Sequence, residues 1–205
     1  NASVLDQEPT VSTTAANASP AGAYDVNATG GADDDYHFTY HGSVLEIGEA
    51  TQQIDDFQVD ANATYGDEPL QLLATTTSGL AVSFSSSNPE VLEVNGTKLE
   101  VRGAGSATIY AHQAGDANFF GAPDLNATVT VHTAELVVIA HPASKAYLEE
   151  IPELSFHYEG FVNDENATAL DEEPSIETTA AAESPAGEYP ITLTGGLAAN
   201  YHFSH

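Results

Sequence analysis

Apolar and polar residues alternate with a period of two along much of the chain. Ala107, Ile109 and Ala111, for example, are separated by Thr108 and Tyr110. Alternation of this kind is typical of a β-strand that buries one face, because successive side chains point to opposite sides of a sheet. The same pattern occurs in the segments 36–40, 99–101, 154–158 and 189–193. No stretch shows the i, i+3, i+4, i+7 stripe of an amphipathic helix, so the pattern predicts an all-β protein.

Turn signals separate the expected strands. The segments 91–94 and 97–101 flank Asn95-Gly96, a dipeptide that tolerates the positive φ angles of a type I′ hairpin turn. Further turns are predicted at the glycine pairs 30–31 and 195–196 and at the Ser-Pro-Ala-Gly sequences 19–22 and 184–187. Short strands between such turns favour tandem antiparallel β-sandwich modules.

The two ends of the chain repeat each other. Residues 1–40 align with residues 166–205 without a gap, at an offset of 165, and 21 of the 40 pairs are identical. Self-similarity at a fixed offset is the signature of tandem modules. It predicts that residues 1–48 are the back part of one module, that 49–134 are a complete middle module, and that 135–205 are a second copy of the first module without its last strand. We therefore expect the chain to be a slice of a longer array.

Short motifs distinguish the two kinds of module. The middle segment contains Tyr65-Gly-Asp-Glu-Pro, Ser85-Ser-Ser-Asn-Pro-Glu-Val and Arg102-Gly-Ala-Gly-Ser-Ala-Thr-Ile, and it resembles the bacterial Ig-like (BIG-type) repeat. The flanking segments contain Ser-Pro-Ala-Gly-x-Tyr and Thr-Gly-Gly, and they resemble the MBG family. One departure is Tyr147-Leu-Glu, where that family has Tyr-Gly-Asp or Tyr-Gly-Glu, so we expect a different turn there.

These resemblances imply a fold and a context. They imply Ig-like β-sandwich modules of a secreted adhesin, matrix or filament protein at a bacterial surface, and they bring no catalytic residues with them. The resulting hypothesis is a non-enzymatic extracellular repeat protein that forms a stalk, fibre or matrix. Two alternatives stay open: an adhesin module that binds glycans or proteins, and an accessory region of a large secreted enzyme.

Charge and composition exclude several partners. The 205 residues include 3 Lys and Arg against 31 Asp and Glu, a formal net charge of −28. Nucleic acids and anionic membrane surfaces are excluded as partners, because binding to either needs clustered basic residues. The chain has no cysteine, so it has neither disulfides nor thiolate-bound zinc. It also lacks an apolar run of about 18 residues, so we expect no membrane insertion.

The strongest chemical signal is the context of the asparagines. Seven of the eleven asparagines precede a Ser or Thr by two positions, whereas chance predicts about two. Five of them also follow an acidic residue by two positions: Asn27, Asn62, Asn95, Asn126 and Asn166. The other two are Asn1 and Asn17. Asp/Glu-x-Asn-x-Ser/Thr resembles the extended acceptor of bacterial N-linked oligosaccharyltransferases, so these residues are candidate glycosylation sites. The alternative is that Asn and Thr simply favour turns in an acid-rich chain.

Other clusters give less specific signals. Asp33, Asp34 and Asp35 are candidate calcium ligands, although they do not match the Asp-x-Asp-x-Asp-Gly loop. His37 and His41 would lie about 13 Å apart on a strand, too far to share one ion. Lys98 and Lys145 could form isopeptide bonds only if buried, and we expect both to be exposed. We thus expect no cofactor beyond N-linked glycans and calcium. The expected partners are neighbouring copies of the array, joined by β-augmentation.

Overall fold

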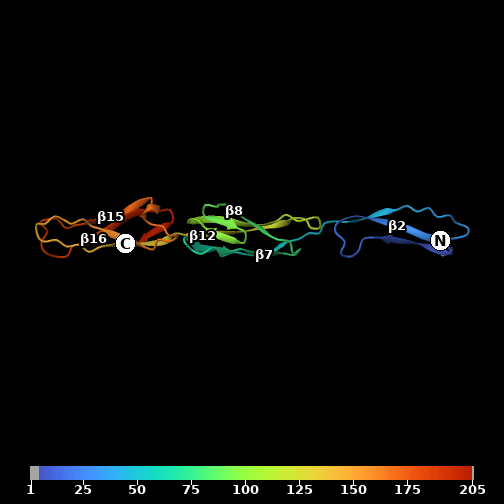
Figure 1. The fold of residues 1–205 in the computed structure, drawn as a ribbon, viewed down its shortest axis with the longest axis horizontal. Helices are drawn as coiled ribbons and strands as arrows, with labels where there is room; N and C mark the ends of the chain where they lie inside the picture. Colours follow the sequence, from blue (N-terminus) through green and yellow to red (C-terminus); the bar gives the residue numbers. More distant parts are fainter. Residues whose placement is uncertain (1–4, 205) are drawn as a thin grey trace. The chain divides into compact units, whose positions relative to one another are not determined.

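The chain folds into β-strands joined by turns. The computed structural model describes residues 5–204. Within that range the only helical element is a short 3₁₀ turn, η2 (Ala167–Ala169), so the prediction of an all-β protein is confirmed (Figure 1). The chain divides into two compact units. The first contains the chain up to Asp55 together with the segments 75–82 and 113–123, and the second contains the remainder.

The first unit begins with a three-stranded antiparallel sheet. Its strands are β1 (Gln7–Thr13), β2 (Gly22–Ala32) and β3 (Ser43–Ile47), in the order β1-β2-β3. No residue between 5 and 50 is buried, and Val11 is 70% exposed. This sheet therefore has an apolar face without a core beneath it among the described residues.

A buried glutamine joins the loops that complete the first unit. The Gln52 side chain is 4% exposed, and its Nε2 donates to Gln113 Oε1 at 2.6 Å and to the Phe120 carbonyl at 2.7 Å. The Ser78 hydroxyl donates to Gln52 Oε1. Because the buried amide uses both its donor and its acceptor, its desolvation is offset by hydrogen bonds to Gln113, at the end of β11, and to the loop residues Ser78 and Phe120.

Nine strands follow between residues 54 and 132. They are β4 (Ile54–Gln58), β5 (Asn62–Thr64), β6 (Leu70–Gln71), β7 (Leu73–Thr76), β8 (Ser83–Ser86), β9 (Leu92–Asn95), β10 (Lys98–Val101), β11 (Gly105–Gln113) and β12 (Ala122–His132). They form the sheets β5-β12-β11-β8, β6-β10-β9 and β4-β7. All pairings with a described register are antiparallel except β5 with β12, which is parallel.

The remaining strands belong to the second unit. They are β13 (Ala134–Ala140), β14 (Phe156–Glu159), β15 (Glu172–Thr178), β16 (Ile191–Leu197) and β17 (Tyr201–Ser204). One sheet has the order β14-β13-β17, with β13 and β17 parallel, and the other pairs β15 with β16. β15 and β16 lie side by side in Figure 1.

A single hydrophobic core runs through the second unit. Leu92, Leu99 and Ile109, from the expected middle module, belong to the same buried cluster as Leu136 and Tyr201, from the expected third module. Only Thr133 separates β12 from β13 along the chain. Because burial of each large aliphatic side chain contributes about 1.5–3 kcal/mol, a shared core couples the two segments energetically.

The sequence repeat is also a repeat of conformation. The bounds of β15 are those of β1 shifted by 165, and all six residue pairs between β1 and β2 recur between β15 and β16, from Gln7 with Ala32 to Glu172 with Leu197. The Tyr24 hydroxyl donates to the Pro20 carbonyl at 2.9 Å, and Tyr189 makes the same bond to Pro185 at 3.0 Å. Equivalent residues in the two copies therefore take equivalent structural roles.

The glycine pairs are not turns, which corrects the prediction. Gly30 and Gly31 lie inside β2 with φ angles of +75° and +87°, and Gly195 and Gly196 lie inside β16 with +77° and +92°. A Cβ on Gly196 would lie 3.0 Å from the ring of Phe203. The pair is therefore a left-handed kink in a continuing strand, where the missing side chain makes room for a packed ring.

The predicted hairpin is confirmed by the antiparallel pairing of β9 with β10, but its turn and one other predicted strand were wrong. The hairpin pairs Asn95 with Lys98, so its two loop residues are Gly96 and Thr97 rather than Asn95 and Gly96. Only Gly96 has a positive φ, which fits a type II′ turn better than a type I′ turn. The alternating segment 36–40 is not a strand, whereas its equivalent in the second copy forms β17 by pairing with β13. An alternating pattern needs a partner strand before it can become part of a sheet.

Candidate functional site

Three polar side chains form a hydrogen-bonded group at the hydrophobic core of the second unit. The Glu165 carboxylate accepts a hydrogen bond from the Tyr65 hydroxyl at 2.7 Å on Oε1 and from the Tyr201 hydroxyl at 2.6 Å on Oε2. The two tyrosines are 6% and 4% exposed. The three side chains come from segments up to 136 residues apart, and we call them the junction triad.

A tight turn positions Glu165. Asn163 and Asp164 have φ angles of +55° and +57°, and the Glu165 N–H donates to the Val162 carbonyl at 3.0 Å. Two consecutive left-handed residues closed by this bond fit a type I′ turn, which Asn and Asp tolerate better than most residues. The Val162 N–H donates to the Tyr201 hydroxyl at 3.1 Å, so the same turn also fixes the tyrosine.

A second turn positions Tyr65. The Asp67 N–H donates to the Thr64 carbonyl at 3.0 Å, and the Asp67 carboxylate accepts from the Thr64 N–H at 2.7 Å. Gly66 has a φ of +93°, and a Cβ there would lie only 2.6 Å from the Val162 side chain. Glycine is thus required twice at position 66, once by the backbone angle and once by the contact with Val162.

A hydrogen bond between a backbone N–H and an asparagine side chain, and several packed aromatic rings, lie around the triad. Asn200 Oδ1 accepts from the Ala104 N–H at 2.9 Å. The rings of Tyr65 and Tyr201 meet edge to face at 5.7 Å, and Phe161 meets Tyr201 in the same way at 5.4 Å. Such pairs contribute about 0.5–1.5 kcal/mol each beyond their burial. The segment around Tyr65 and Ala104 is therefore fixed to the segment around Glu165 and Tyr201 by several independent contacts.

The surroundings keep the tyrosines protonated. Burial and the hydrogen bond to Glu165 raise the pKa of Tyr201 to about 12, and the same two causes raise the pKa of Tyr65. Burial, followed by the negative charge of Glu173, raises the pKa of Tyr158. At neutral pH Tyr65 and Tyr201 are thus hydrogen-bond donors to a carboxylate, an arrangement suited to holding two segments together.

All described candidate glycosylation residues lie at the surface: Asn17, Asn27, Asn62, Asn95, Asn126 and Asn166 are exposed. Asn1 lies outside the described residues. Asn166 Oδ1 accepts from the Thr168 N–H at 3.0 Å and caps the 3₁₀ turn. Asn95 Nδ2 donates to Glu100 Oε1 at 3.0 Å. The structure thus presents these asparagines to solvent but does not gather them into one site.

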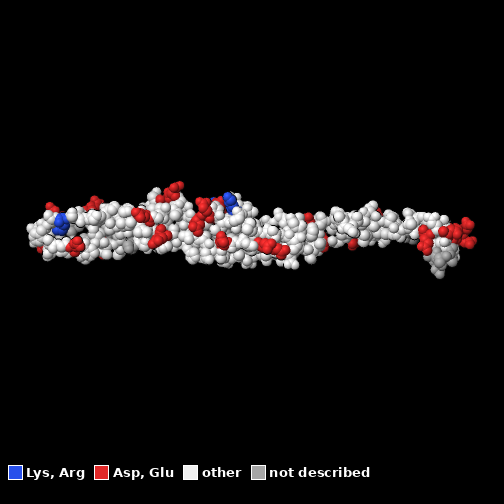
Figure 2. Space-filling view, turned by 90° about the horizontal axis from the view of Figure 1, so that it is seen from below, with Lys and Arg blue, Asp and Glu red and all other residues white. Residues whose placement is uncertain are grey.

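The acidic cluster at residues 33–35 stabilises a turn. Asp33 Oδ1 accepts from the Asp35 N–H at 2.8 Å, and its Oδ2 accepts from the Asp6 N–H at 3.3 Å. Asp34 and Asp35 are exposed. Across residues 5–204, no group of three or more His, Asp or Glu side chains has the arrangement of a metal site. Figure 2 shows acidic side chains spread over the face in view, with few basic ones between them.

The lysines and histidines take separate positions. Lys98 is exposed, as expected. Lys145 is half-buried instead, because its Nζ donates to the carbonyls of Ala146 at 3.2 Å and Ala182 at 3.0 Å. His37 and His41 are exposed, and His202, the repeat equivalent of His37, makes a 3.1 Å hydrogen bond with Thr133. The part of the chain that the structure describes has no helix with the length and apolar character needed to cross a membrane.

The turn at Tyr147 has the same hydrogen bonds as the turn at Tyr65, so the expectation of a different turn there is wrong. The Glu149 N–H donates to the Ala146 carbonyl at 3.1 Å, and the Glu149 carboxylate accepts from the Ala146 N–H at 2.8 Å. This is the bonding pattern of the turn at Tyr65. Leu148 has a φ of +67°, so a leucine takes the left-handed conformation that Gly66 takes in the other turn. The departure from Tyr-Gly-Asp therefore leaves a strained leucine in the turn but does not change the hydrogen bonds that form it.

Sequence reasoning missed the junction triad and the buried Gln52. Tyr65 belonged to a recognised motif and Glu165 to a candidate acceptor sequence, but neither carried a signal of its partner. The positive-φ tolerance of Asn163-Asp164 was the one local sign of a tight turn before Glu165.

One comparison with known proteins matches part of the chain. A search of curated proteins finds no match. Residues 136–205 match the family described as MBG domain (YGX type). Domains of this family are typical of extracellular and surface proteins, which agrees with an adhesin-like repeat context. The matched third of the chain contains the Tyr147 turn, two residues of the junction triad and the second copy of the repeat.

Proposed function

We propose that this chain is part of a non-enzymatic extracellular array that extends a stalk, fibre or matrix at a bacterial surface. In this proposal residues 1–48 and 135–205 are MBG-like modules, residues 49–134 are a BIG-type module, and each has an Ig-like sandwich architecture. The observation that carries the proposal is the junction triad inside a shared core. A polar network and a continuous core between successive modules suit a spacer that must keep its form, whereas a ligand-binding module does not need them.

The repeat geometry supports the same function. Six residue pairs of one strand pair recur at an offset of 165, so one structural solution is used twice in the chain. Solenoid and array proteins obtain stability from such units and from contacts between neighbours. The high negative charge keeps units soluble, and screening within about 8 Å at physiological salt limits repulsion between them.

Stretching the chain between its two ends tests this function. A spacer predicts that the second unit unfolds in one event, because β11 and β13 share a core, while the β1-β2-β3 sheet opens earlier at lower force. Glu165→Ala should split the event of the second unit into two, and Glu177→Ala, an exposed glutamate of β15, should not. If the unaltered chain already shows separate events for the middle and third segments, the spacer proposal fails.

N-linked glycans would add to this function. The six described candidate asparagines are exposed, and an oligosaccharyltransferase needs an accessible side-chain amide. Peptides from native protein that contain Asn27, Asn62, Asn95, Asn126 or Asn166 should carry hexose-type mass additions. Unmodified peptides from native material would refute glycosylation and leave the spacer proposal untouched.

A further inference from the structure

An asparagine joins the first segment of the chain to the middle segment. Asn118 Oδ1 accepts a hydrogen bond from the Ala21 N–H at 2.8 Å, and the Asn118 carbonyl accepts from the Ala50 N–H at 2.7 Å. Ala21 lies in the loop before β2, and Ala50 lies in the linker after β3. Phe119, the residue after the asparagine, pairs with Ala50 in a parallel bridge. The side chain and the backbone of Asn118 therefore bind the loop and the linker at the same time.

A second asparagine makes the same contacts between the middle and third segments. Asn200 Oδ1 accepts from the Ala104 N–H at 2.9 Å, and the Asn200 carbonyl accepts from the Ala134 N–H at 2.9 Å. Tyr201, the residue after the asparagine, pairs with Ala134 in parallel. Corresponding residues of the two junctions are 82 to 84 positions apart in the sequence. This equivalence is therefore separate from the sequence repeat, whose offset is 165.

The loops that receive the two asparagines also have the same structure. Each loop alanine precedes a strand, β2 or β11, and the neighbouring strand in the sheet, β3 or β12, continues into the linker. The residue after each loop alanine is a glycine with a positive φ, +150° at Gly22 and +138° at Gly105. Glycine adopts such angles without the steric cost that a side chain brings. The asparagines therefore bind loops that share both a sequence, Ala-Gly, and a backbone conformation.

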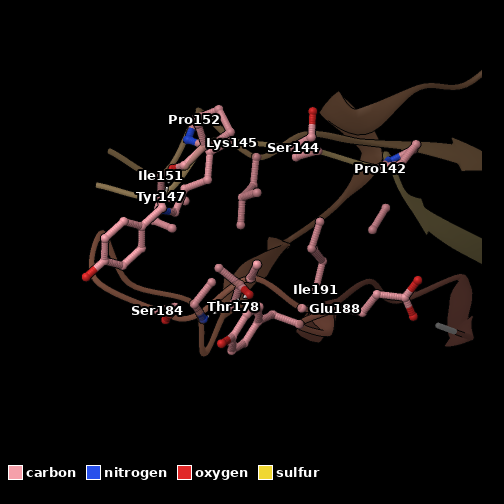
Figure 3. A pocket seen from close by; sticks show the side chains of 18 of the residues that line it. Pro142, Ser144, Lys145, Tyr147, Ile151, Pro152, Thr178, Ser184, Glu188 and Ile191 are labelled. Carbon is pink, nitrogen blue, oxygen red and sulfur yellow. Dashed lines mark hydrogen bonds between the residues drawn. The ribbon is translucent and has the colours of Figure 1, made fainter. Parts of the chain in front are cut away.

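Hydrogen bonds within each segment fix the two sides of the first junction. On the loop side, the Ser19 hydroxyl oxygen accepts from the Ala16 N–H at 2.8 Å, and Ser184 makes the equivalent bond in the second copy of the repeat (Figure 3). On the other side, the Asp116 carboxylate accepts from the Asn118 N–H at 2.8 Å. Both bonds are independent of the Asn118 side chain, so removal of that side chain should leave the two loops folded.

We propose that the asparagine and the Ala-Gly loop form a docking element by which one module recognises the module before it. The asparagine contacts backbone N–H groups and no side chain at these positions, so the contact does not depend on the rest of the preceding module's sequence. The partner that fits is a β-module with an Ala-Gly loop beside its outgoing linker. One element can then serve both orders, the first kind of module before the second and the second before the first.

The two docking asparagines differ from the candidate glycosylation sites. Asn118 and Asn200 are half-buried, whereas the described candidate glycosylation asparagines are exposed. Neither Asn118 nor Asn200 precedes a Ser or Thr by two positions. A glycan on either side-chain amide would obstruct the loop that the asparagine binds. The sequence therefore keeps the acceptor pattern away from the residues that need a free carboxamide.

This inference rests on the proposed array and names the contact that joins its modules. Amide hydrogen exchange of the full chain tests it at single residues. In Asn118→Ala, the Ala21 N–H loses its acceptor and should exchange about fivefold faster. The Ala50 N–H should exchange as before, because it is bound to the backbone carbonyl of residue 118. Asn118→Asp keeps a side-chain oxygen as acceptor and should restore the protection of Ala21.

The second junction must respond in the same way. Asn200→Ala should accelerate the exchange of the Ala104 N–H by a similar factor, and Asn126→Ala, which removes an exposed asparagine of β12, should change neither junction. A response at one junction only would overturn the shared docking element. Equal acceleration of Ala21 and Ala50 in Asn118→Ala would also overturn it, because the side chain would then only support its own loop. These outcomes are read from single amides, whereas the number of unfolding events decides the spacer proposal, so the two failures are distinguishable.

Discussion

Replacement of Glu165 by alanine should destabilise the second unit as a whole. The carboxylate is the acceptor for the hydroxyls of Tyr65 and Tyr201 at 2.7 and 2.6 Å, and both tyrosines are almost fully buried. Hydrogen bonds to a charged group contribute about 1.5–3 kcal/mol each, and a buried donor without a partner costs about 1–3 kcal/mol. Relief of the partial desolvation of Glu165 offsets some of this loss. We therefore expect the free energy of unfolding to fall by about 3 kcal/mol.

Urea unfolding measures this loss if the m-value stays constant. Glu165→Gln should lose less than Glu165→Ala, because the amide oxygen still accepts one of the two hydroxyls. Glu177→Ala removes an exposed glutamate and should change the free energy of unfolding by at most about 0.5 kcal/mol. If Glu165→Ala and Glu177→Ala give the same midpoint, the triad does not stabilise the junction.

Three further changes test other parts of the account. Leu148→Gly should stabilise the chain by about 0.5–1 kcal/mol in thermal unfolding, because it relieves a left-handed leucine that is 62% exposed, whereas Gly66→Ala should destabilise it. Above pH 10 the unfolded chain loses the Tyr201 proton, while the folded chain, with a pKa of about 12, retains it. The free energy of unfolding should therefore fall by about 1 kcal/mol per pH unit between pH 10 and 12, and Tyr201→Phe should reduce this slope in urea titrations. Gln52→Ala should lower the free energy of unfolding of the first unit by about 1–3 kcal/mol, because it removes the hydrogen-bond partner that Gln113 and Ser78 share. If the hydrogen exchange of the loop amides does not change in this variant, Gln52 does not hold the loops together.

The strand pattern could be predicted because it depends on short-range chemistry. The alternation at 107–111 predicts β11, and the alternation at 99–101 predicts most of β10. The segment 36–40 alternates in the same way and forms no strand, whereas its equivalent 201–204 pairs with β13. Period-two alternation indicates which face can be buried, but the neighbouring strand decides whether a ladder forms.

The junction triad could not be predicted because Glu165 meets Tyr201 across 36 positions and Tyr65 across 100. A half-buried carboxylate between two buried tyrosines is favourable only when all three are present in the right geometry, and no local pattern records that dependence. Gly66 shows the same limit. Its turn could be predicted from Tyr-Gly-Asp, but its close contact with Val162 is visible only in the folded chain.

Native-state hydrogen exchange in low urea tests the central claim most directly, namely that the middle and third segments form one cooperative unit around the junction. Buried strands in one cooperative unit exchange with the same free energy and the same dependence on denaturant. We predict that the amides of Ile109 in β11 and Val138 in β13 share both values, and that Glu165→Ala lowers both free energies together. Free energies that differ by more than about 1 kcal/mol in the unaltered chain, with different dependences on urea, would contradict the account.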